Sequence, residues 1–584
     1  MTSKKTKLTT IWAFFALPLL TPVFSQDSET FTPLGSTTDI VFSDLDGDYQ
    51  KIRGFSFSAD GDHVAIGNPN GKDFGTVRVY KWTDSQWQQL GQELIGFDVT
   101  EEFQPGNDGF GMKLSLSGNG SRLAVSSPYA SPDGQTGIGQ TRVFEFSDTT
   151  WKQLGQPLNG VFRSRLSASS ISLSANGTRL AIGGEANLVG GENEGLVRVF
   201  ELSGSAWVKV GSDIYGTARN ERSGTSVSLS EDGSRLAIAS TAFGGEPNPS
   251  RTRVYEYLEA DWSQMGEDIN AVGGLIGSVD LAADGNRLAI ANGGIPGIDD
   301  IMGPNSVRIY DYTEGNWSQN GQAIALPEND ESRGAMVSLS ANGKRVAVSS
   351  TWEVGRGTND GFISLYEILD DSLLQIGGTF TRNSIWSSGA MRTPALNADG
   401  SRLAFLAPSR AITDDTRAGN DFVSVYSVKD QKMELTVSAP ANGSVNEDAA
   451  GTYNLGETVT ITATANSGYV FSRWIGDASG DDNPLLLFMD ADKAISAVFE
   501  QDKADNDNDG TNNYQEIIIY GTDPNDADTD DDGFNDGYEI AAGTNPLDKT
   551  EIPALTTITP ILTNARALGA QGNLQINAPD GITW

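Results

Sequence analysis

The sequence of 584 residues contains no cysteine and a single histidine, His63. The lack of cysteine excludes disulfides, thiol nucleophiles and metals bound by thiolates. One histidine leaves almost no scope for a histidine-based catalytic triad. The stability of the chain must therefore come from packing or from a metal held by oxygen ligands.

Positive charge is also scarce in this chain. Lys and Arg together number 40, Asp and Glu number 77, and the formal net charge is -37. Proteins that bind nucleic acid need a basic surface, and electrostatic docking on an anionic membrane needs one as well. The charge balance therefore argues against nucleic acid and anionic lipid as partners.

Long hydrophobic runs are absent except at the N-terminus. Three lysines within the first seven residues precede an apolar stretch, residues 8–20, and the small residue Ser25 precedes a plausible cleavage site. This order is typical of a signal peptide, so we expect residues 1–25 to be removed on export. A membrane anchor is the alternative, but the stretch is short for a span and Pro18 interrupts it. We expect no membrane span after cleavage.

Glycine is abundant, with 67 residues, and many glycines belong to a phrase that recurs seven times. In this phrase an alternating strand is followed by Asp-Gly or Asn-Gly and then by a second strand. Both dipeptides favour the positive φ angles of a type I′ turn, so seven hairpins of this type are predicted. The dipeptides begin, 52 to 59 residues apart, at Asp60, Asn119, Asn176, Asp232, Asp284, Asn342 and Asp399.

Each repeat continues with two further predicted strands. The third alternates apolar and polar positions, as in residues 77–80, and the fourth starts near a Trp and contains Leu-Gly or a variant, as in residues 87–91. Four short strands repeated seven times are typical of a β-propeller. Residues 26–432 are therefore predicted to form a seven-bladed β-propeller, with a linear β-solenoid as the alternative.

The end repeats favour a closed ring over a linear rod. The seventh repeat ends with its third strand, residues 422–428, and a strand of the missing fourth type lies near the N-terminus, residues 32–40. We expect these two segments to pair. The pairing would complete the last blade and remove an open strand edge that would otherwise invite aggregation.

Several short phrases connect the repeats to a known family. Phe110-Gly111 stands at the start of one repeat, and Ser126-Ser-Pro128 or Gly67-Asn-Pro69 follows the second strand. With these phrases, residues 32–432 resemble the bacterial FG-GAP, integrin-α-like propellers. Some members of that family bind calcium between strands, but the turns here lack alternating carboxylates, and residues 44–48 are only a fragment of such a loop.

Residues 433–500 lose the propeller phrase and show short alternating strands separated by glycines, which predicts a small β domain. The run Gly-Tyr-x-Phe-x-x-Trp, residues 468–474, followed by Gly-Asp, resembles the divergent internalin-type B repeat of bacterial surface proteins. Tyr469 and Trp474 have two interpretations. They are either a platform that stacks on sugars or core residues of the small sheet, and we favour the core.

Two twelve-residue loops, 505–516 and 528–539, carry the clearest chemistry. In each, acidic or amide side chains occupy positions 1, 3, 5 and 9, glycine occupies position 6 and glutamate position 12. With a backbone carbonyl at position 7, this set supplies the oxygens that Ca²⁺ prefers, and the glycine permits the sharp turn. A disordered acidic linker is the alternative. The predicted metal ligands are Asp505, Asp507, Asp509, Thr511, Asn513, Glu516, Asp528, Asp530, Asp532, Phe534, Asp536 and Glu539.

The flanks of these loops refine the prediction. Gly-Thr-Asp-Pro, residues 521–524, and Gly-Thr-Asn-Pro, residues 543–546, leave too little room for full EF-hand helices. Residues 501–549 resemble bacterial thrombospondin type 3 repeats, which implies a calcium-stiffened spacer. The first loop has Asn513 where the second has Asp536, so we expect weaker binding there. Residues 550–584 stay unassigned, and their end without a sorting motif is consistent with a truncated chain.

The predicted fold class is all-β: a seven-bladed β-propeller, a small β domain and a calcium-binding loop segment. The favoured function is an exported, calcium-binding, non-enzymatic bacterial protein, secreted or at the cell surface. As a monomer it would bind a protein or glycan ligand, or mediate adhesion, through its propeller loops. One alternative is a polysaccharide hydrolase or lyase with a carboxylate site in the propeller funnel; another is a purely architectural envelope protein. We assign no catalytic residue, and the loop charges that the enzyme would use are Glu353, Arg356, Asp414, Asp415 and Arg417.

Overall fold

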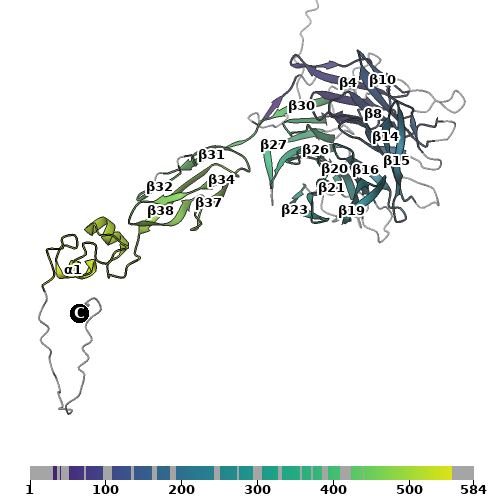
Figure 1. Ribbon diagram of the computed structural model, residues 1–584. Helices are drawn as coiled ribbons and strands as arrows, with labels where there is room; N and C mark the ends of the chain where they lie inside the picture. The colour runs from purple at the N-terminus through teal and green to yellow at the C-terminus, as the bar shows by residue number, and fades with distance from the viewer. Residues whose placement is uncertain are drawn as a thin grey trace, which may run out of the picture. The chain divides into compact units, whose positions relative to one another are not determined.

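The computed structural model divides the chain into two compact units, Met1–Lys429 and Asp430–Trp584, which are described separately. The described residues are 30–35, 40, 52–71, 74–96, 108–132, 137–160, 167–184, 193–241, 250–271, 275–293, 306–326, 332–354, 358–369, 372–384, 392–407, 422–438, 440–446 and 448–554. No helix among them combines the length and the apolar character that a membrane span requires. The all-β fold class is confirmed, with four-stranded antiparallel sheets as the main element (Figure 1).

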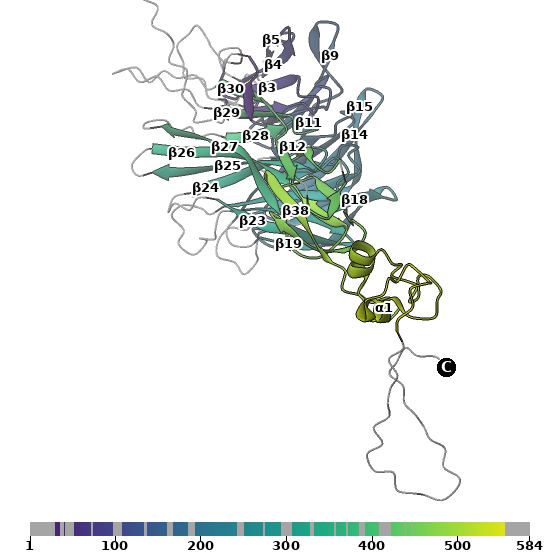
Figure 2. The same cartoon turned by 90° about the vertical axis from the view of Figure 1, so that its left-hand side faces the viewer.

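Unit 1 contains seven antiparallel sheets of four or five strands in its described residues. Figure 2 shows one of them, β24 to β27, with its strands side by side. In chain order the sheets are β2 (Gly54–Phe57), β3 (His63–Asn68), β4 (Thr76–Thr83), β5 (Gln86–Gln89) and β6 (Leu94–Ile95); β7 (Leu114–Leu116), β8 (Arg122–Ser127), β9 (Gln140–Ser147), β10 (Thr150–Gln153) and β11 (Leu158–Asn159); β12 (Ser167–Leu173), β13 (Arg179–Gly184), β14 (Leu196–Ser203) and β15 (Ala206–Tyr215); β16 (Ser223–Leu229), β17 (Arg235–Ser240), β18 (Arg251–Leu258) and β19 (Asp261–Asn270); β20 (Leu275–Leu281), β21 (Arg287–Gly293), β22 (Ser306–Thr313) and β23 (Asn316–Ala325); β24 (Ser332–Leu339), β25 (Arg345–Val354), β26 (Thr358–Ile368) and β27 (Leu373–Ser384); and β28 (Arg392–Leu396), β29 (Arg402–Ala407) and β30 (Phe422–Val428) with β1 (Phe31–Pro33).

The hairpin turns between the first and second strands differ from the predicted type I′. The prediction requires positive φ at both central residues, but at all seven turns, each within the described chain, only the glycine has positive φ. In the first turn Gly61 donates its N–H to the Ser58 carbonyl, and Asp60 accepts the N–H of Asp62 on its side chain. The aspartate or asparagine therefore caps the turn, and the glycine that follows provides the left-handed step.

A ring of backbone hydrogen bonds joins the seven turns. Each turn donates a backbone N–H to a carbonyl of the next, and the last turn returns to the first. The sheets therefore form a closed ring, as in a β-propeller, and not a linear rod. The donor and acceptor pairs are Asp60 to Gly118, Gly118 to Ala175, Ala175 to Glu231, Glu231 to Ala283, Ala283 to Ala341, Asn342 to Ala398 and Ala398 to Ala59.

The residue that begins each second strand adds another link between neighbouring repeats. In six repeats it is arginine, whose Nη1 donates to a backbone oxygen of the following turn at 2.7 to 3.1 Å. Arg402 of the last repeat reaches Gly61 of the first. His63 takes the place of arginine in the first repeat, where it is 6% exposed and lies against Gly120 of the next turn. The single histidine therefore occupies, in the first repeat, the structural position that arginine has in the other six repeats.

The recurring Trp and Leu-Gly of the fourth strands form the outer contact between sheets. The indole N–H of each tryptophan donates to a backbone carbonyl on the fourth strand of the preceding repeat, at 2.8 to 3.2 Å. The five pairs are Trp87 with Leu34, Trp151 with Leu90, Trp207 with Leu154, Trp262 with Val210, and Trp317 with Met265.

The N-terminal strand β1 pairs with β30 in the sheet of the last repeat, where the sequence places its closing strand. Phe31 is opposite Val428 and Pro33 opposite Tyr426, so the pairing starts one residue earlier than predicted. Ile40 also accepts the Val423 N–H, whereas residues 36–39 lie outside the described part of the chain. One sheet of the ring is thus built from segments almost 400 residues apart in the sequence.

Asp280 on β20 stands where the neighbouring first strand, β16, has a serine. Ser228 Oγ accepts the Leu281 N–H at 3.0 Å, and Asp280 Oδ2 accepts the Leu339 N–H at 2.8 Å in the same way. Asp280 Oδ1 also accepts the Ser228 hydroxyl at 2.9 Å. Burial outweighs these hydrogen bonds and raises the pKa of Asp280 from 3.8 to about 6.

Replacing Asp280 by asparagine is expected to stabilise the propeller at about pH 8 by up to about 3 kcal/mol, and much less at about pH 4. The carboxyl pKa is higher in the folded chain than in the unfolded chain. The stability that the protonated group contributes is therefore present below about pH 4 and lost as the pH rises through about 6. Urea unfolding of the full chain at both pH values measures the effect. Asp284→Asn, an exposed turn residue, is the control, and an equal effect of Asp280→Asn at both pH values would contradict this account.

In its described residues, unit 2 contains a small β domain followed by two short helices. Its largest sheet has the order β33–β31–β38–β36, and β32–β35 and β34–β37 form two-stranded sheets. The buried residues include Trp474, Ile461 and Met489. The elements are β31 (Lys432–Val437), β32 (Gly443–Val445), β33 (Gly451–Asn454), β34 (Thr458–Ile461), β35 (Ala463–Ala465), β36 (Tyr469–Gly476), β37 (Leu485–Phe488), β38 (Lys493–Gln501), the π-helix η3 (Gln515–Tyr520) and α1 (Asp536–Ala542).

Candidate metal centre

Each of the two acidic loops of unit 2 ends in a short helix. Gly510 and Gly533 at position 6 have φ of +99° and +96°, in the region that favours glycine. Asn508 and Asp531 at position 4 also have positive φ, which their short polar side chains tolerate. The two loops thus have the same backbone conformation at these positions, which turns alternate side chains to one side.

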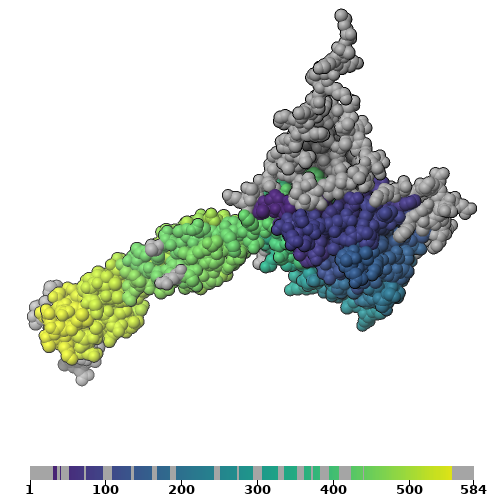
Figure 3. All heavy atoms as spheres, turned by 90° about the horizontal axis from the view of Figure 1, so that it is seen from above, coloured from purple at the N-terminus to yellow at the C-terminus, as the bar shows by residue number. Residues whose placement is uncertain are grey.

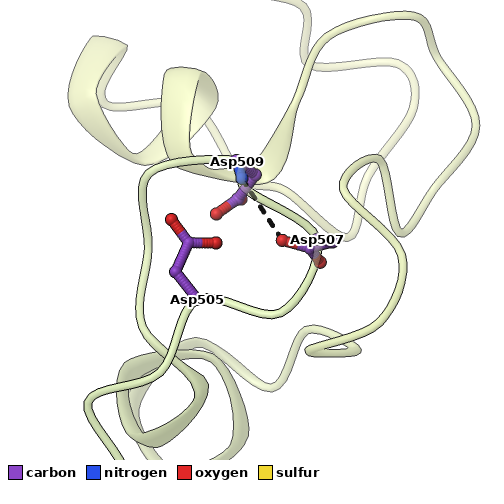
Figure 4. Close-up of side chains that lie close together, drawn as sticks. All are labelled: Asp505, Asp507 and Asp509. Carbon is purple, nitrogen blue, oxygen red and sulfur yellow. Dashed lines mark hydrogen bonds between the residues drawn. The ribbon is translucent and has the colours of Figure 1, made fainter.

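In the first loop, Asp505, Asp507 and Asp509 converge (Figure 4). One carboxylate oxygen from each lies within 4.8 Å of the others. Backbone N–H groups hold the side chains in place: Gly510 donates to Asp505 at 3.1 Å, and Thr511 donates to Asp509 at 2.6 Å. The loop therefore gathers three carboxylates without any cationic side chain among their hydrogen-bond donors.

The second loop repeats this arrangement with Asp528, Asp530 and Asp532, whose oxygens also lie within 4.8 Å of one another. Gly533 donates to Asp528 at 2.8 Å and Phe534 donates to Asp532 at 2.9 Å. These are the same positions as in the first loop, so two independent segments of sequence arrive at the same geometry.

The closing glutamates, Glu516 on η3 and Glu539 on α1, are both 0% exposed. Neither oxygen of Glu516 has a hydrogen-bond partner, and neither does Oε2 of Glu539. Buried carboxylate oxygens without partners are costly unless a cation compensates them. Further buried oxygens without partners belong to Asp505, Asp507, Asp530 and Asp532. The donor set therefore fits a hard divalent cation such as Ca²⁺.

Crowding of these carboxylates changes their acidity. Burial, together with the negative charges of Asp507, Asp509 and Asp505, raises the pKa of Glu516 to about 7. Burial, followed by Asp532 and Asp530, raises the pKa of Glu539 to about 7 as well. Both loops thus hold more negative charge than the protein alone can compensate, which is the condition that a bound cation relieves.

Position 9 of each loop has a role that the sequence did not predict. Asn513 Oδ1 accepts the N–H of Asn506 at position 2, and Asp536 Oδ1 accepts the N–H of Thr529 at the same position of the second loop. The Thr529 hydroxyl also donates to Asp536 Oδ2 at 2.6 Å. The position 9 side chains therefore close their own loops.

The two loops are also in contact with each other. Oxygens of Asp536 from the second loop lie within 4.8 Å of oxygens of Asp509 and Glu516 from the first. The N–H of Gly537 donates to Asp509 Oδ2 at 2.6 Å, and a Cβ at Gly537 would lie 2.4 Å from the Asp509 carbonyl oxygen. The sequence predicts two separate sites, whereas in the structure the start of α1 packs on the first loop. Gly537 is the sequence signal for this close approach.

The two position 7 residues, Thr511 and Phe534, were predicted to act through their carbonyl oxygens. Thr511 is buried, and the ring of Phe534 stacks on Tyr538 with centroids 5.9 Å apart. The side chains are thus packed within their loops, which agrees with a role for the backbone at this position.

Both aromatic residues considered for sugar stacking, Tyr469 and Trp474, belong to the core of the small β domain. Trp474 is 1% exposed and its indole N–H donates to the Asp482 carbonyl, so it is a core residue, as favoured from the sequence. Tyr469 is half-buried against the same core, and its ring also packs edge-on against Tyr514 of the first loop, with centroids 5.3 Å apart. Figure 3 shows the atoms of the β domain in green and of the loop segment in yellow, adjoining one another. Tyr469 therefore also joins the β domain to the segment that carries the acidic loops.

The loop charges proposed for an enzyme cannot be placed in a site. Arg356, Asp414, Asp415 and Arg417 lie outside the described residues, and for Glu353 only the backbone is described. The fragment at residues 44–48 lies outside them as well.

Comparisons with known sequence families identify the parts of unit 2. Residues 433–503 match the Divergent InlB B-repeat domain, and residues 505–527 and 528–549 each match the Bacterial TSP3 repeat. The chain therefore contains a divergent internalin-type B repeat and two bacterial thrombospondin type 3 repeats. Repeats of these kinds are typical of extracellular proteins, and the TSP3 repeats are of the calcium-binding type.

Comparisons with whole proteins add little to these identifications. No match to the chain is found among curated proteins. Solved structures with some likeness include the Dos1 propeller, with 14% identity over 65% of this chain and 78% of that one and a TM-score of 0.37. They also include the RRP9 WD40 repeats, with 11% identity, 68% and 100% coverage and a TM-score of 0.40. A putative 6-phosphogluconolactonase from Bacteroides uniformis has 14% identity, 62% and 95% coverage and a TM-score of 0.39. With TM-scores this low, the likeness carries no argument about this chain.

Proposed function

We propose that this protein is an exported, calcium-binding, non-enzymatic protein of the bacterial surface or surroundings. In this proposal the propeller binds a protein or glycan ligand, and the B repeat with the two TSP3 repeats forms a spacer that calcium stiffens. The observation that carries the proposal is the pair of loops with matching carboxylates and buried, unpartnered glutamate oxygens.

Calcium is proposed to bind once in each loop, through the side chains at positions 1, 3, 5 and 12 and the carbonyl at position 7. The position 9 residues, Asn513 and Asp536, contribute through a water molecule, which is common at this position of calcium loops and leaves their loop-closing hydrogen bonds intact. Asp536 also lies beside the carboxylates of the first loop. We therefore expect the two affinities to be closer than the difference at position 9 alone implies.

The role of the propeller is proposed from its architecture and from the FG-GAP resemblance. Adhesion or ligand binding through the loops between strands is the favoured role, and a purely architectural role is the alternative. The first strands of the sheets, in their described residues, support a binding or architectural role, because the same contact from a serine hydroxyl to a backbone N–H of the next sheet recurs around the ring. We expect the mature chain to be a monomer that starts near Gln26.

Calorimetric titration of the mature full-length protein with CaCl₂ tests the calcium part of the proposal. We expect two binding events with dissociation constants on the order of 10⁻⁴ to 10⁻³ M, as in extracellular calcium modules. Binding to arrays of glycans and matrix proteins, with calcium and with a chelator, then tests the ligand part. The absence of calcium heat would contradict the first part, and a polysaccharide-cleaving activity of the pure protein would contradict the second.

A further inference from the structure

The segment that follows each closing glutamate turns back onto it. Gly521 and Gly543 end the two helices with left-handed φ of +82° and +83°. The next residue, Thr522 or Thr544, donates its backbone N–H to the carbonyl of the glutamate, at 3.1 Å for Glu516 and 3.0 Å for Glu539. The Gly-Thr phrase thus places one threonine against each closing glutamate.

The threonine hydroxyl of the second repeat reaches the glutamate carboxylate. Thr544 Oγ1 lies 3.3 Å from Glu539 Oε1 and 3.2 Å from the Glu539 carbonyl oxygen. In the first repeat Thr522 is 5% exposed, its hydroxyl is buried without a partner, and both oxygens of Glu516 also lack partners. The two repeats therefore share the same backbone contact. In the first, the Thr522 hydroxyl and both Glu516 carboxylate oxygens are buried and none of them has a hydrogen-bond partner.

We propose that Thr522 and Thr544 are positioning residues for calcium, each holding its closing glutamate by a hydrogen bond from the hydroxyl to a carboxylate oxygen. This inference rests on the proposed calcium binding. A carboxylate that holds an ion keeps one lone pair on each oxygen free for a donor, and the threonine hydroxyl supplies that donor. Such outer-shell hydrogen bonds orient a metal ligand and are worth roughly 10- to 100-fold in metal affinity.

A merely structural role of the threonine hydroxyl predicts a different experimental result. If the hydroxyl only caps the helix by bonding the glutamate carbonyl, its loss would lower the stability of the calcium-free protein and leave the calcium affinity of the folded loop unchanged. If the hydroxyl positions the carboxylate, its loss weakens calcium binding in its own loop. The two roles are therefore separated by measuring affinity and calcium-free stability in the same variants.

The test uses full-length protein with Thr522→Val and Thr544→Val, which keep the branched shape and remove the hydroxyl. Calorimetric titration with CaCl₂ is expected to show about tenfold weaker binding at one of the two sites in each variant. Thr522→Ser and Thr544→Ser, which keep the donor, are expected to restore the affinity. Thr550→Val, an exposed threonine beyond the second loop, is the matched control and is expected to bind as the unaltered protein does.

A second measurement keeps the proposal testable if a valine variant does not fold. Thr544→Cys supplies a weak thiol donor of similar size, so its affinity is expected between those of serine and valine. The lifetime of Tb³⁺ luminescence, compared in H₂O and D₂O, is expected to report an extra bound water in the cysteine variant, because the glutamate is held less firmly. If the unaltered protein binds calcium and the valine or cysteine variants bind it with unchanged affinity, this inference alone is overturned. Unaltered protein without calcium heat would overturn the proposed function itself.

Discussion

Replacing Phe31 by alanine is expected to lower the free energy of unfolding of the propeller by about 3–5 kcal/mol, the usual cost of emptying a buried phenylalanine site. Phe31 is 1% exposed and its ring packs edge-on against Phe380, with centroids 4.8 Å apart. It also lies against Gly377, in the way that tryptophans lie against the glycine of the preceding fourth strand elsewhere in the ring. The side chain thus anchors the three-residue strand β1, which closes the last sheet.

The loss should also change the solution behaviour of the protein. Without its anchor, β1 would leave β30 with a free edge, which promotes association between chains. Urea unfolding and light scattering of the full-length protein measure both effects. Thr32→Ala is the matched control, because Thr32 is on the same strand and exposed. A Phe31→Ala protein as stable and as monodisperse as Thr32→Ala would contradict closure of the ring by β1.

Replacing Glu516 and Glu539 together by glutamine is expected to abolish the stabilisation of unit 2 by calcium. Calcium at about a hundred times its dissociation constant should stabilise the unaltered protein by about 2.7 kcal/mol per site, hence about 5 kcal/mol in all. Glutamine preserves the size of the side chain but removes the charge that closes each loop. The affinity loss is expected to reach about a hundredfold or more, since even outer-shell contacts are worth 10- to 100-fold.

Without calcium the same substitutions should act in the opposite direction. The pKa of each glutamate is about 7 in the folded chain, above its usual value of 4.5. The stability linked to the protonated form is therefore present below about pH 4.5 and lost as the pH rises through about 7. Above that pH, glutamine removes a buried, unpaired charge, so the chelated variant should be more stable than the chelated unaltered protein.

Thermal unfolding at about pH 8, with calcium and with EGTA, measures whether the effect of the double substitution on stability changes sign when calcium is removed. Glu551→Gln is the matched control, because Glu551 is exposed and lies outside both loops. A double variant that keeps the full calcium response would contradict the assignment of the closing ligands. A double variant that is less stable than the unaltered protein in EGTA would contradict the account of crowded carboxylates.

The parts of this protein that the sequence predicted depend on contacts within short segments. The hairpins centred on Asp-Gly and Asn-Gly, and the gathering of carboxylates at positions 1, 3 and 5 of each loop, need only neighbouring residues and a glycine that accepts positive φ. Even so, the predicted turn type was wrong. Asp-Gly and Asn-Gly also suit a turn in which only the glycine has positive φ, and the dipeptide alone does not distinguish this turn from type I′.

The sequence was sufficient to predict the all-β class, the repeating strands, the B repeat and the two acidic loops, because these features follow from local periodicity and fixed ligand spacing. Three contacts could be found only in the folded chain: His63 lies against the turn of Gly120, Tyr469 packs on Tyr514, and Gly537 contacts Asp509 of the first loop. These contacts join residues from separate elements. Their geometry depends on how completed sheets and loops pack together, which no local pattern specifies.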